Sequence, residues 1–371
     1  MEHIHSTELS RKPWPFELTA RAKQIAWAGR SKLAAVALAI IATVCGLGGG
    51  FAYAAQDSLP GDNLYPVKIS TEEFRRVFTV GDVAEAELEL TFANRRLEEI
   101  AAMTKTEPDA ISMAVNGYQR NVTAGIERAE EIKNPAQSAN LFESVAMVTL
   151  QHLKILDSLH DVSSENSQSS IEQAHEIAFS THVRALRDLA MENPLRAAEI
   201  NLLTIDSRLD RARATAEQNE TEKAELALIQ FEELIRLGED LSQISKRLGH
   251  DTTDVDELNA RATAAHMEVL GLIYGKAPEQ TKEVVENAME ASAEAHGQAV
   301  EGLQEKGAID NIPQEPPIPD AIPEEVKERI LTPGSEDSGG KSGESGNGSG
   351  GSGQGSSNSG NGSSGSGNGQ N

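Results

Sequence analysis

Residues Ala86–Ile100 read AELELTFANRRLEEI, and this stretch decides the fold class. Its apolar side chains follow a 3-4-3 spacing, which places them on one stripe of an α-helix: Leu90, Ala93, Leu97 and Ile100. Stripes of this kind continue over residues 82–306, where the alternating pattern of a β-strand is absent. The sequence therefore predicts an all-α protein.

Breaks in the pattern divide residues 82–306 into about eight helices of roughly 20–29 residues. Asn134-Pro135 and Asn193-Pro194 look like helix starts, because Asn caps free N–H groups and Pro needs no N–H partner in the first turn. The other breaks lie at 106–108, 163–167, 218–220, 249–253 and 275–278.

The eight predicted helices read as two copies of four. The stretch AELEL at 86–90 recurs as AEINL at 198–202, an offset of 112 residues. Further matches occur at offsets of 113 and 114: Tyr118/Phe231, Gly125/Gly238, His152/His266, Ile171/Val285, Glu172/Glu286, Glu176/Glu290 and His182/His296. Because the infrequent His and Gly positions stay in register, we predict two tandem four-helix repeats, residues 82–191 and 194–306.

A membrane-span pattern precedes the helices. Residues 33–55, LAAVALAIIATVCGLGGGFAYAA, are uncharged and long enough as a helix to cross a bilayer. Residues 1–32 carry six Lys and Arg against three Glu, whereas the whole chain has a formal net charge of −25. We therefore predict a single-pass membrane protein with a cytoplasmic N-terminus and an extracytoplasmic bulk. Ala52-Tyr53-Ala54 also fits a signal-peptidase site, which leaves cleavage after Ala54 as an alternative.

A turn motif, SLPGDNLYPVK at 58–68, follows the predicted span. Pro60-Gly61 suits the centre of a type II turn, since Pro fixes its own φ and Gly allows a positive one. We treat this as a structural motif consisting of Leu59, Pro60, Gly61, Asp62, Leu64, Tyr65, Pro66 and Lys68.

The first helix is predicted to begin after this turn. Pro66 restricts Tyr65 to extended geometry, and Ser70 with Glu73 forms a capping box. Residues 56–81 should therefore be a stiff linker followed by a short helix.

The string LPGDNLYPVK, Glu72, Glu73 and the stretch 86–100 together resemble a bacterial extracytoplasmic domain of unknown function. The clear likeness covers residues 57–103, and a looser one covers His266–Leu303. The resemblance implies a domain placed after a single membrane span, found in some proteins that act as anti-sigma factors in actinobacteria. It implies almost nothing about chemistry, and an anti-sigma-type regulator stays an alternative function.

The chain after the repeats is predicted to lose order. Residues 307–332 are rich in proline, which favours an extended spacer, with one or two helical turns at 324–331. Residues 333–371 consist largely of Gly, Ser and Asn and are predicted to be disordered.

A metal site is the best candidate for chemistry. Glu172-x-x-His175 has the spacing used in ferritin-like bundles, but its copy, Glu286-x-x-Met289, lacks the histidine. Across an antiparallel hairpin, His152 and His182 should be offset by roughly 15 Å, too far to share an ion. We predict no metal ligand, no cofactor and no catalytic residue, and a metal-binding four-helix bundle stays an alternative.

The remaining patterns indicate binding. Charged residues such as Arg96, Glu98 and Glu99 are predicted to lie on solvated helix faces. The acidic charge disfavours nucleic acid, and the single Cys45 allows no internal disulfide. We predict a non-enzymatic, membrane-anchored extracytoplasmic module for envelope interaction, sensing or regulation. Its expected partners are the membrane and an envelope or regulatory protein, and no oligomeric state is predicted.

Overall fold

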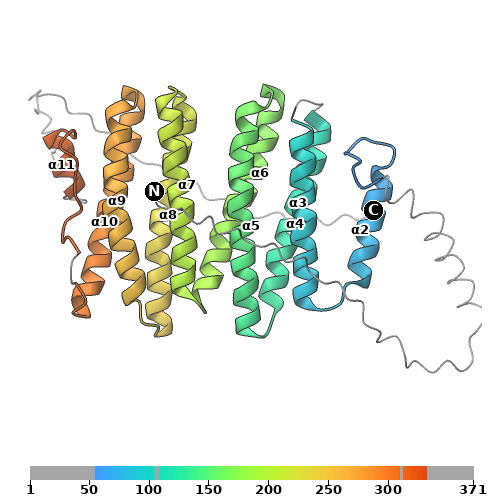
Figure 1. The fold of residues 1–371 in the computed structure, drawn as a ribbon, viewed down its shortest axis with the longest axis horizontal. Helices are drawn as coiled ribbons and strands as arrows, with labels where there is room; N and C mark the ends of the chain where they lie inside the picture. The colour runs from blue at the N-terminus through green and yellow to red at the C-terminus, as the bar shows by residue number, and fades with distance from the viewer. Residues whose placement is uncertain (1–54, 105–107, 310–311, 332–371) are drawn as a thin grey trace, which may run out of the picture.

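The computed structural model describes residues 55–104, 108–309 and 312–331. Within these residues the protein has ten α-helices and no strand, which confirms the all-α prediction (Figure 1). None of these helices is long and apolar enough to span a membrane. The predicted cytoplasmic segment 1–32, the predicted span 33–55 except Ala55, and the predicted tail 333–371 lie outside the described residues.

Eight long helices follow one short helix and precede another. In chain order they are α2 (Tyr65–Phe78), α3 (Asp82–Ala102), α4 (Pro108–Glu131), α5 (Pro135–Val162), α6 (Glu165–Ala190), α7 (Pro194–Glu217), α8 (Thr221–Leu248), α9 (Thr253–Lys276), α10 (Glu279–Glu305) and α11 (Glu324–Leu331). The eight helices α3–α10 contain 21–28 residues each, close to the predicted lengths.

Local sequence sets several helix boundaries. The side chains of Asn134 and Asn193 accept hydrogen bonds from N–H groups three residues later, at 3.1 Å and 3.2 Å. A proline occupies the first turn of both helices, so these two predicted helix starts are confirmed. Gly249 ends α8 with a φ of +80°, a left-handed conformation that suits glycine.

The long helices form four antiparallel hairpins that stack side by side (Figure 1). Helices α3, α5, α7 and α9 make one layer, and α4, α6, α8 and α10 make the other. We call α3–α6 the first half and α7–α10 the second half. One apolar cluster extends from Ala86 to Ile330, so the halves share a continuous core and are not separate bundles.

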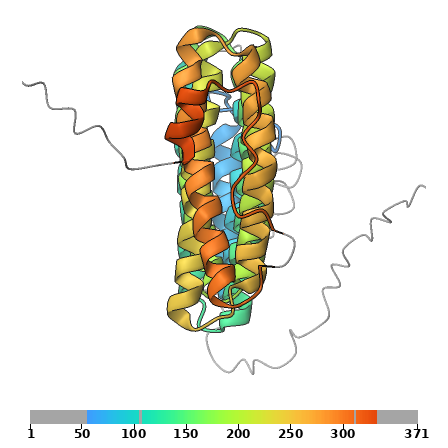
Figure 2. The same cartoon turned by 90° about the vertical axis from the view of Figure 1, so that its left-hand side faces the viewer.

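The Pro-rich segment after α10 is packed against the protein, so the prediction of a spacer at 307–332 is wrong. Figure 2 shows it running back along the last hairpin and ending in α11. Ile312 lies against α9 and α10, and Ile322 and Ile330 are 2% and 0% exposed. These isoleucines cover apolar surface that the last hairpin would otherwise expose to water. We call residues 312–331 the C-terminal strap. The predicted helical turns at 324–331 are present as α11.

Helix α2 begins at Tyr65, so the predicted capping box at Ser70 is also wrong. Ser70 lies inside the helix, where its hydroxyl donates to the carbonyl of Pro66 at 2.8 Å. Pro66 explains the earlier start, because its fixed φ and missing N–H suit the first turn of a helix.

Candidate functional site

The predicted turn motif has the geometry that its sequence requires. The N–H of Asp62 donates to the carbonyl of Leu59 at 2.9 Å, and Gly61 has a φ of +97°. The carboxylate of Asp62 also accepts the N–H of Leu59 at 2.7 Å, which closes the turn from the other side. Leu64 occupies the N-cap position of α2 without a side-chain hydrogen bond, and Pro66 lies in the first turn.

The last part of the motif enters a buried ion cluster between α2 and α3. Arg96 donates to both carboxylate oxygens of Glu72 at 2.6 Å, and Lys68 lies 2.6 Å from Glu99. Arg96 also donates to the hydroxyl of Tyr65 and to Glu99. Arg96 and Glu99 are 1% and 2% exposed, so the prediction of a solvated face is wrong for these two residues.

Burial controls the protonation of this ion cluster. It raises the pKa of Tyr65 to about 12, with Arg96 opposing the shift and Glu99 adding to it. Burial also raises the pKa of Glu99, although Lys68 and Arg96 act against that effect. The motif residues Tyr65 and Lys68 thus lock α2 onto α3, which is a structural role.

The second half contains a similar buried arginine, 112 residues later. Arg208 donates to Asp157 at 2.6 Å and to Gln230 at 3.1 Å, and it is 1% exposed. Burial would raise the pKa of Asp157, but hydrogen bonds from His175 and Arg208 outweigh burial and lower it to about 2. Each arginine therefore ties its own helix to an acidic residue on a preceding helix.

His152 and His182 are both buried, and each has its own hydrogen-bond partners. His152 contacts Tyr118 at 2.9 Å through Nδ1 and Asn94 through Nε2. His182 contacts the carbonyl of Ala146 at 3.0 Å and the hydroxyl of Thr204 at 2.9 Å. Burial lowers the pKa of both histidines to about 4. Among the described residues, no three His, Cys, Asp or Glu side chains are placed to hold a metal ion.

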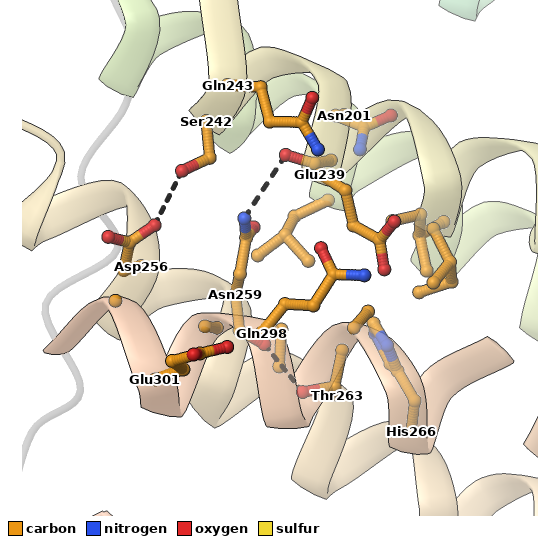
Figure 3. Close-up of a pocket in the computed structure, with 18 of the residues that line it drawn as sticks. Asn201, Glu239, Ser242, Gln243, Asp256, Asn259, Thr263, His266, Gln298 and Glu301 are labelled. Atoms are coloured by element: carbon orange, nitrogen blue, oxygen red, sulfur yellow. Dashed lines mark hydrogen bonds between the residues drawn. The ribbon is translucent and has the colours of Figure 1, made fainter. Parts of the chain in front are cut away.

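A polar pocket of about 310 Å³ lies inside the second half, between α7, α8, α9 and α10 (Figure 3). Its exposed rim includes Gln243 and Lys246 on α8 and Gln298, Glu301 and Glu305 on α10. The deeper walls combine polar and aliphatic side chains: Asn201, Leu202, Ile205, Ile235, Glu239, Ser242, Asp256, Asn259, Ala262, Thr263, His266, Ala295 and Ala299.

Two buried polar atoms in the pocket walls have no hydrogen-bond partner. Asn201 is 2% exposed and donates through Nδ2 to the carbonyl of Leu234 at 2.9 Å, but its Oδ1 is unpaired. His266 is 4% exposed and has an unpaired Nδ1. The ring of His266 packs against Phe231 at the position where His152 pairs with the hydroxyl of Tyr118, which accounts for its unpaired Nδ1. Buried polar atoms are usually paired, so the free Oδ1 of Asn201 marks the pocket wall as a place where a ligand can supply a partner.

The two buried or half-buried carboxylates of the pocket have different environments. Asp256 accepts from Ser242 at 2.6 Å, from Thr252 at 2.8 Å and from Lys306 at 2.8 Å, so it is well compensated. Glu239 is half-buried, and burial raises its pKa to about 7, with a further contribution from the nearby Glu294.

The first half has apolar side chains where the second half has this pocket. At the sequence offsets of 113 and 114, Glu239 and Asn259 correspond to Ile126 and Val145, which are 1% and 0% exposed. Ser242 and Asp256 correspond in the same way to Ala129 and Phe142, which also belong to the core. The apolar side chains fill these positions of the first half, and the polar ones leave space in the second half.

Residues 57–177 match the family model described as Domain of unknown function (DUF5667). No curated protein and no solved structure matches the chain. The DUF5667 match extends from the turn motif through α5 into α6 and includes the ion cluster. It is longer than the likeness at 57–103 predicted from the sequence. The looser likeness at 266–303 and the pocket both lie outside the match.

A second pocket, of about 460 Å³, lies at the boundary of the two halves, between α5, α6, α7 and α8. Its cations are already paired with aspartates. Arg208 lies 2.6 Å from Asp157, and Lys223 lies 2.8 Å from Asp161, which also pairs with Arg211. We therefore take the pocket of the second half as the candidate functional site.

Sequence reasoning did not find this site. Asn201, Glu239, Asn259 and His266 stand far apart along the chain and match no known motif. The alignment of the two predicted repeats did contain a signal. At several aligned positions the second repeat has a polar residue and the first repeat has an apolar one.

Proposed function

We propose that the protein is a non-enzymatic, membrane-anchored binding module whose second half holds a small polar solute outside the cytoplasm. One observation carries this proposal. Core positions occupied by Ile126 and Val145 in the first half are occupied by Glu239 and Asn259 in the second half, where a polar pocket is open. Polar side chains at core positions give up the burial of apolar surface, which costs stability, so a function that uses them explains their presence.

The proposal includes a duplication of the four-helix unit. The carbonyl of Ala146 and the hydroxyl of Thr149 contact His182, and Ala260 and Thr263 contact His296 in the same way, 114 residues later. The ring of His152 meets Tyr118 at 5.4 Å, and that of His266 meets Phe231 at 5.6 Å. Shared ancestry accounts for these recurring contacts, and later divergence accounts for the pocket.

The hydroxyl groups in the pocket favour binding over catalysis. Ser242 donates to Asp256 at 2.6 Å, and Thr263 donates to the carbonyl of Asn259 at 2.8 Å. The first bond joins α8 to α9 and the second lies within α9. Asp256 also accepts from Thr252 and pairs with Lys306, so it is already used as a structural partner and not as a free base for Ser242.

Anchoring to the membrane is supported by the uncharged run at 33–55 and the basic residues before it. A reporter domain fused after Leu331 should be active only outside the cytoplasm. Activity inside the cytoplasm would contradict the proposed topology.

The binding proposal is tested by transferring residues from the first half into the second. In the double variant E239I/N259V, the pocket receives the apolar residues of the first half. Full-length protein is titrated with amines, polyols and carboxylates of two to six carbons, and binding is measured by calorimetry. We expect at least one solute to bind the unaltered protein and to lose binding in the variant.

A matched control is I126L, which alters the corresponding core position of the first half and should leave binding unchanged. Circular dichroism checks that both variants remain helical. Equal binding by the unaltered protein and the double variant, or no binding of any solute, would contradict the proposal.

A further inference from the structure

We propose that the ligand of this pocket is a small organic cation, an alkyl amine or diamine with protonated amino groups. This inference rests on the proposed function and adds the chemical class of the ligand. It follows from the unpaired acceptor of Asn201, the charge and the aliphatic surface of the pocket.

The buried unpaired amide oxygen of Asn201 favours a ligand that donates hydrogen bonds. Asn201 uses its amide N–H toward Leu234, so its free Oδ1 can only accept. Ammonium groups donate three hydrogen bonds and accept none, so they match this atom.

The charge of the pocket favours a cation. Its lining contains four carboxylates and one lysine: Glu239, Asp256, Glu301, Glu305 and Lys246. Lys306 compensates Asp256 at 2.8 Å. Three carboxylates then face one lysine, which gives the pocket a negative potential that attracts cations. No group of three metal-ligating side chains occurs among the described residues, so the pocket is better suited to an organic cation than to a metal ion.

The size and the apolar walls favour a short aliphatic ligand. A volume of about 310 Å³ is at the lower end of small-molecule sites. Leu202, Ile205 and Ile235 provide a surface for methylene groups between the polar ends. Two glycines let polar side chains of the pocket pack closely against α8 and α10. A Cβ added to Gly302 would lie 2.8 Å from Asp256, and one added to Gly238 would lie 3.4 Å from Asn201.

The closing experiment compares three solutes of equal length on the full-length protein by calorimetry: 1,4-diaminobutane, 1,4-butanediol and succinate. We expect the diamine to bind at least tenfold more tightly than the diol and succinate not to bind. E239Q should weaken diamine binding at least tenfold, whereas E233Q, an exposed glutamate on the same helix, should not change it.

A second readout does not depend on any variant. Because burial raises the pKa of Glu239 to about 7, this carboxylate gains its charge between pH 6 and pH 8, and diamine binding should strengthen by up to about tenfold over that range. The titratable and charged groups around Glu239 and the pocket are Arg236, Asp240 and Lys246 on α8, Asp256 and His266 on α9, and Glu294, Glu301 and Glu305 on α10. From α7 the pocket receives the neutral Asn201.

The outcomes separate the two proposals. Binding of the diol or of succinate as tight as that of the diamine would overturn the cation assignment and leave the binding function standing. Failure of the diamine together with binding of another solute would do the same. If none of the solutes binds, both proposals are overturned.

Discussion

At the scale of single residues, Arg96 shows how the turn motif acts. Its guanidinium contacts Glu72, Tyr65 and Glu99 in a site that excludes water. Removing one member of a buried ion pair leaves the partner charge uncompensated, which costs more than the pair itself contributes. The motif is therefore explained by the attachment of α2 to the helical array.

Replacing this arginine should destabilise the protein. We expect R96M to lower the free energy of unfolding by about 3–5 kcal/mol, since Glu72 and Glu99 would keep only Lys68 as a buried cation. Urea denaturation of the full-length protein measures the change. The neighbouring R95M is the control, because Arg95 is 31% exposed and lies 3.3 Å from Glu72, so its loss should cost under about 1 kcal/mol. Equal effects of the two substitutions would contradict the role of the cluster.

The sequence did not reveal which charged residues are buried. Arg95 and Arg96 are adjacent and chemically identical, and Glu98 and Glu99 likewise differ only in helical phase. The apolar stripe of Leu90, Leu97 and Ile100 places these four charged residues near its edge. The helix that packs beside the stripe then decides which of the four side chains are buried. That neighbour is α2, whose start at Tyr65 the sequence analysis had placed too late.

At the scale of elements, the helices were predictable and the C-terminal strap was not. Long amphipathic stripes and Asn-Pro caps are local signals, so α3–α10 could be read directly from the sequence. The strap lacks a helical period and contains many prolines, which are equally typical of free linkers. Its order comes from tertiary contacts of Ile312, Ile322 and Ile330, which a local pattern does not show.

Packing of the strap can be tested at one glycine of α9. A Cβ added to Gly271 would lie 2.8 Å from Cβ of Pro319 and would clash with its Cγ, so G271A should displace the strap. The control is G275A in the same helix, where a Cβ would meet nothing within 4 Å. Hydrogen exchange of residues 312–331 should become faster in G271A and stay unchanged in G275A. Unchanged exchange in both variants would show that the strap is held in some other way.

At the scale of the whole molecule, the protein is a continuous two-layer array closed at both ends. The ion cluster holds α2 at one end, and the C-terminal strap covers the hairpin at the other (Figures 1 and 2). Between these ends the two halves share a frame of helices and buried histidines. They differ at the positions around the pocket, which carry apolar side chains in the first half and polar side chains in the second.

Hydrogen exchange of the full-length protein, with and without 1,4-diaminobutane, tests the central claim most directly, because the first half serves as an internal control. We expect the diamine to slow exchange around the pocket, at residues 235–246, 256–266 and 295–305. The corresponding residues 122–133, 142–152 and 181–191 of the first half should be unaffected. Equal slowing in both halves, or slowing confined to the first half, would contradict the claim that the second half contains the binding site.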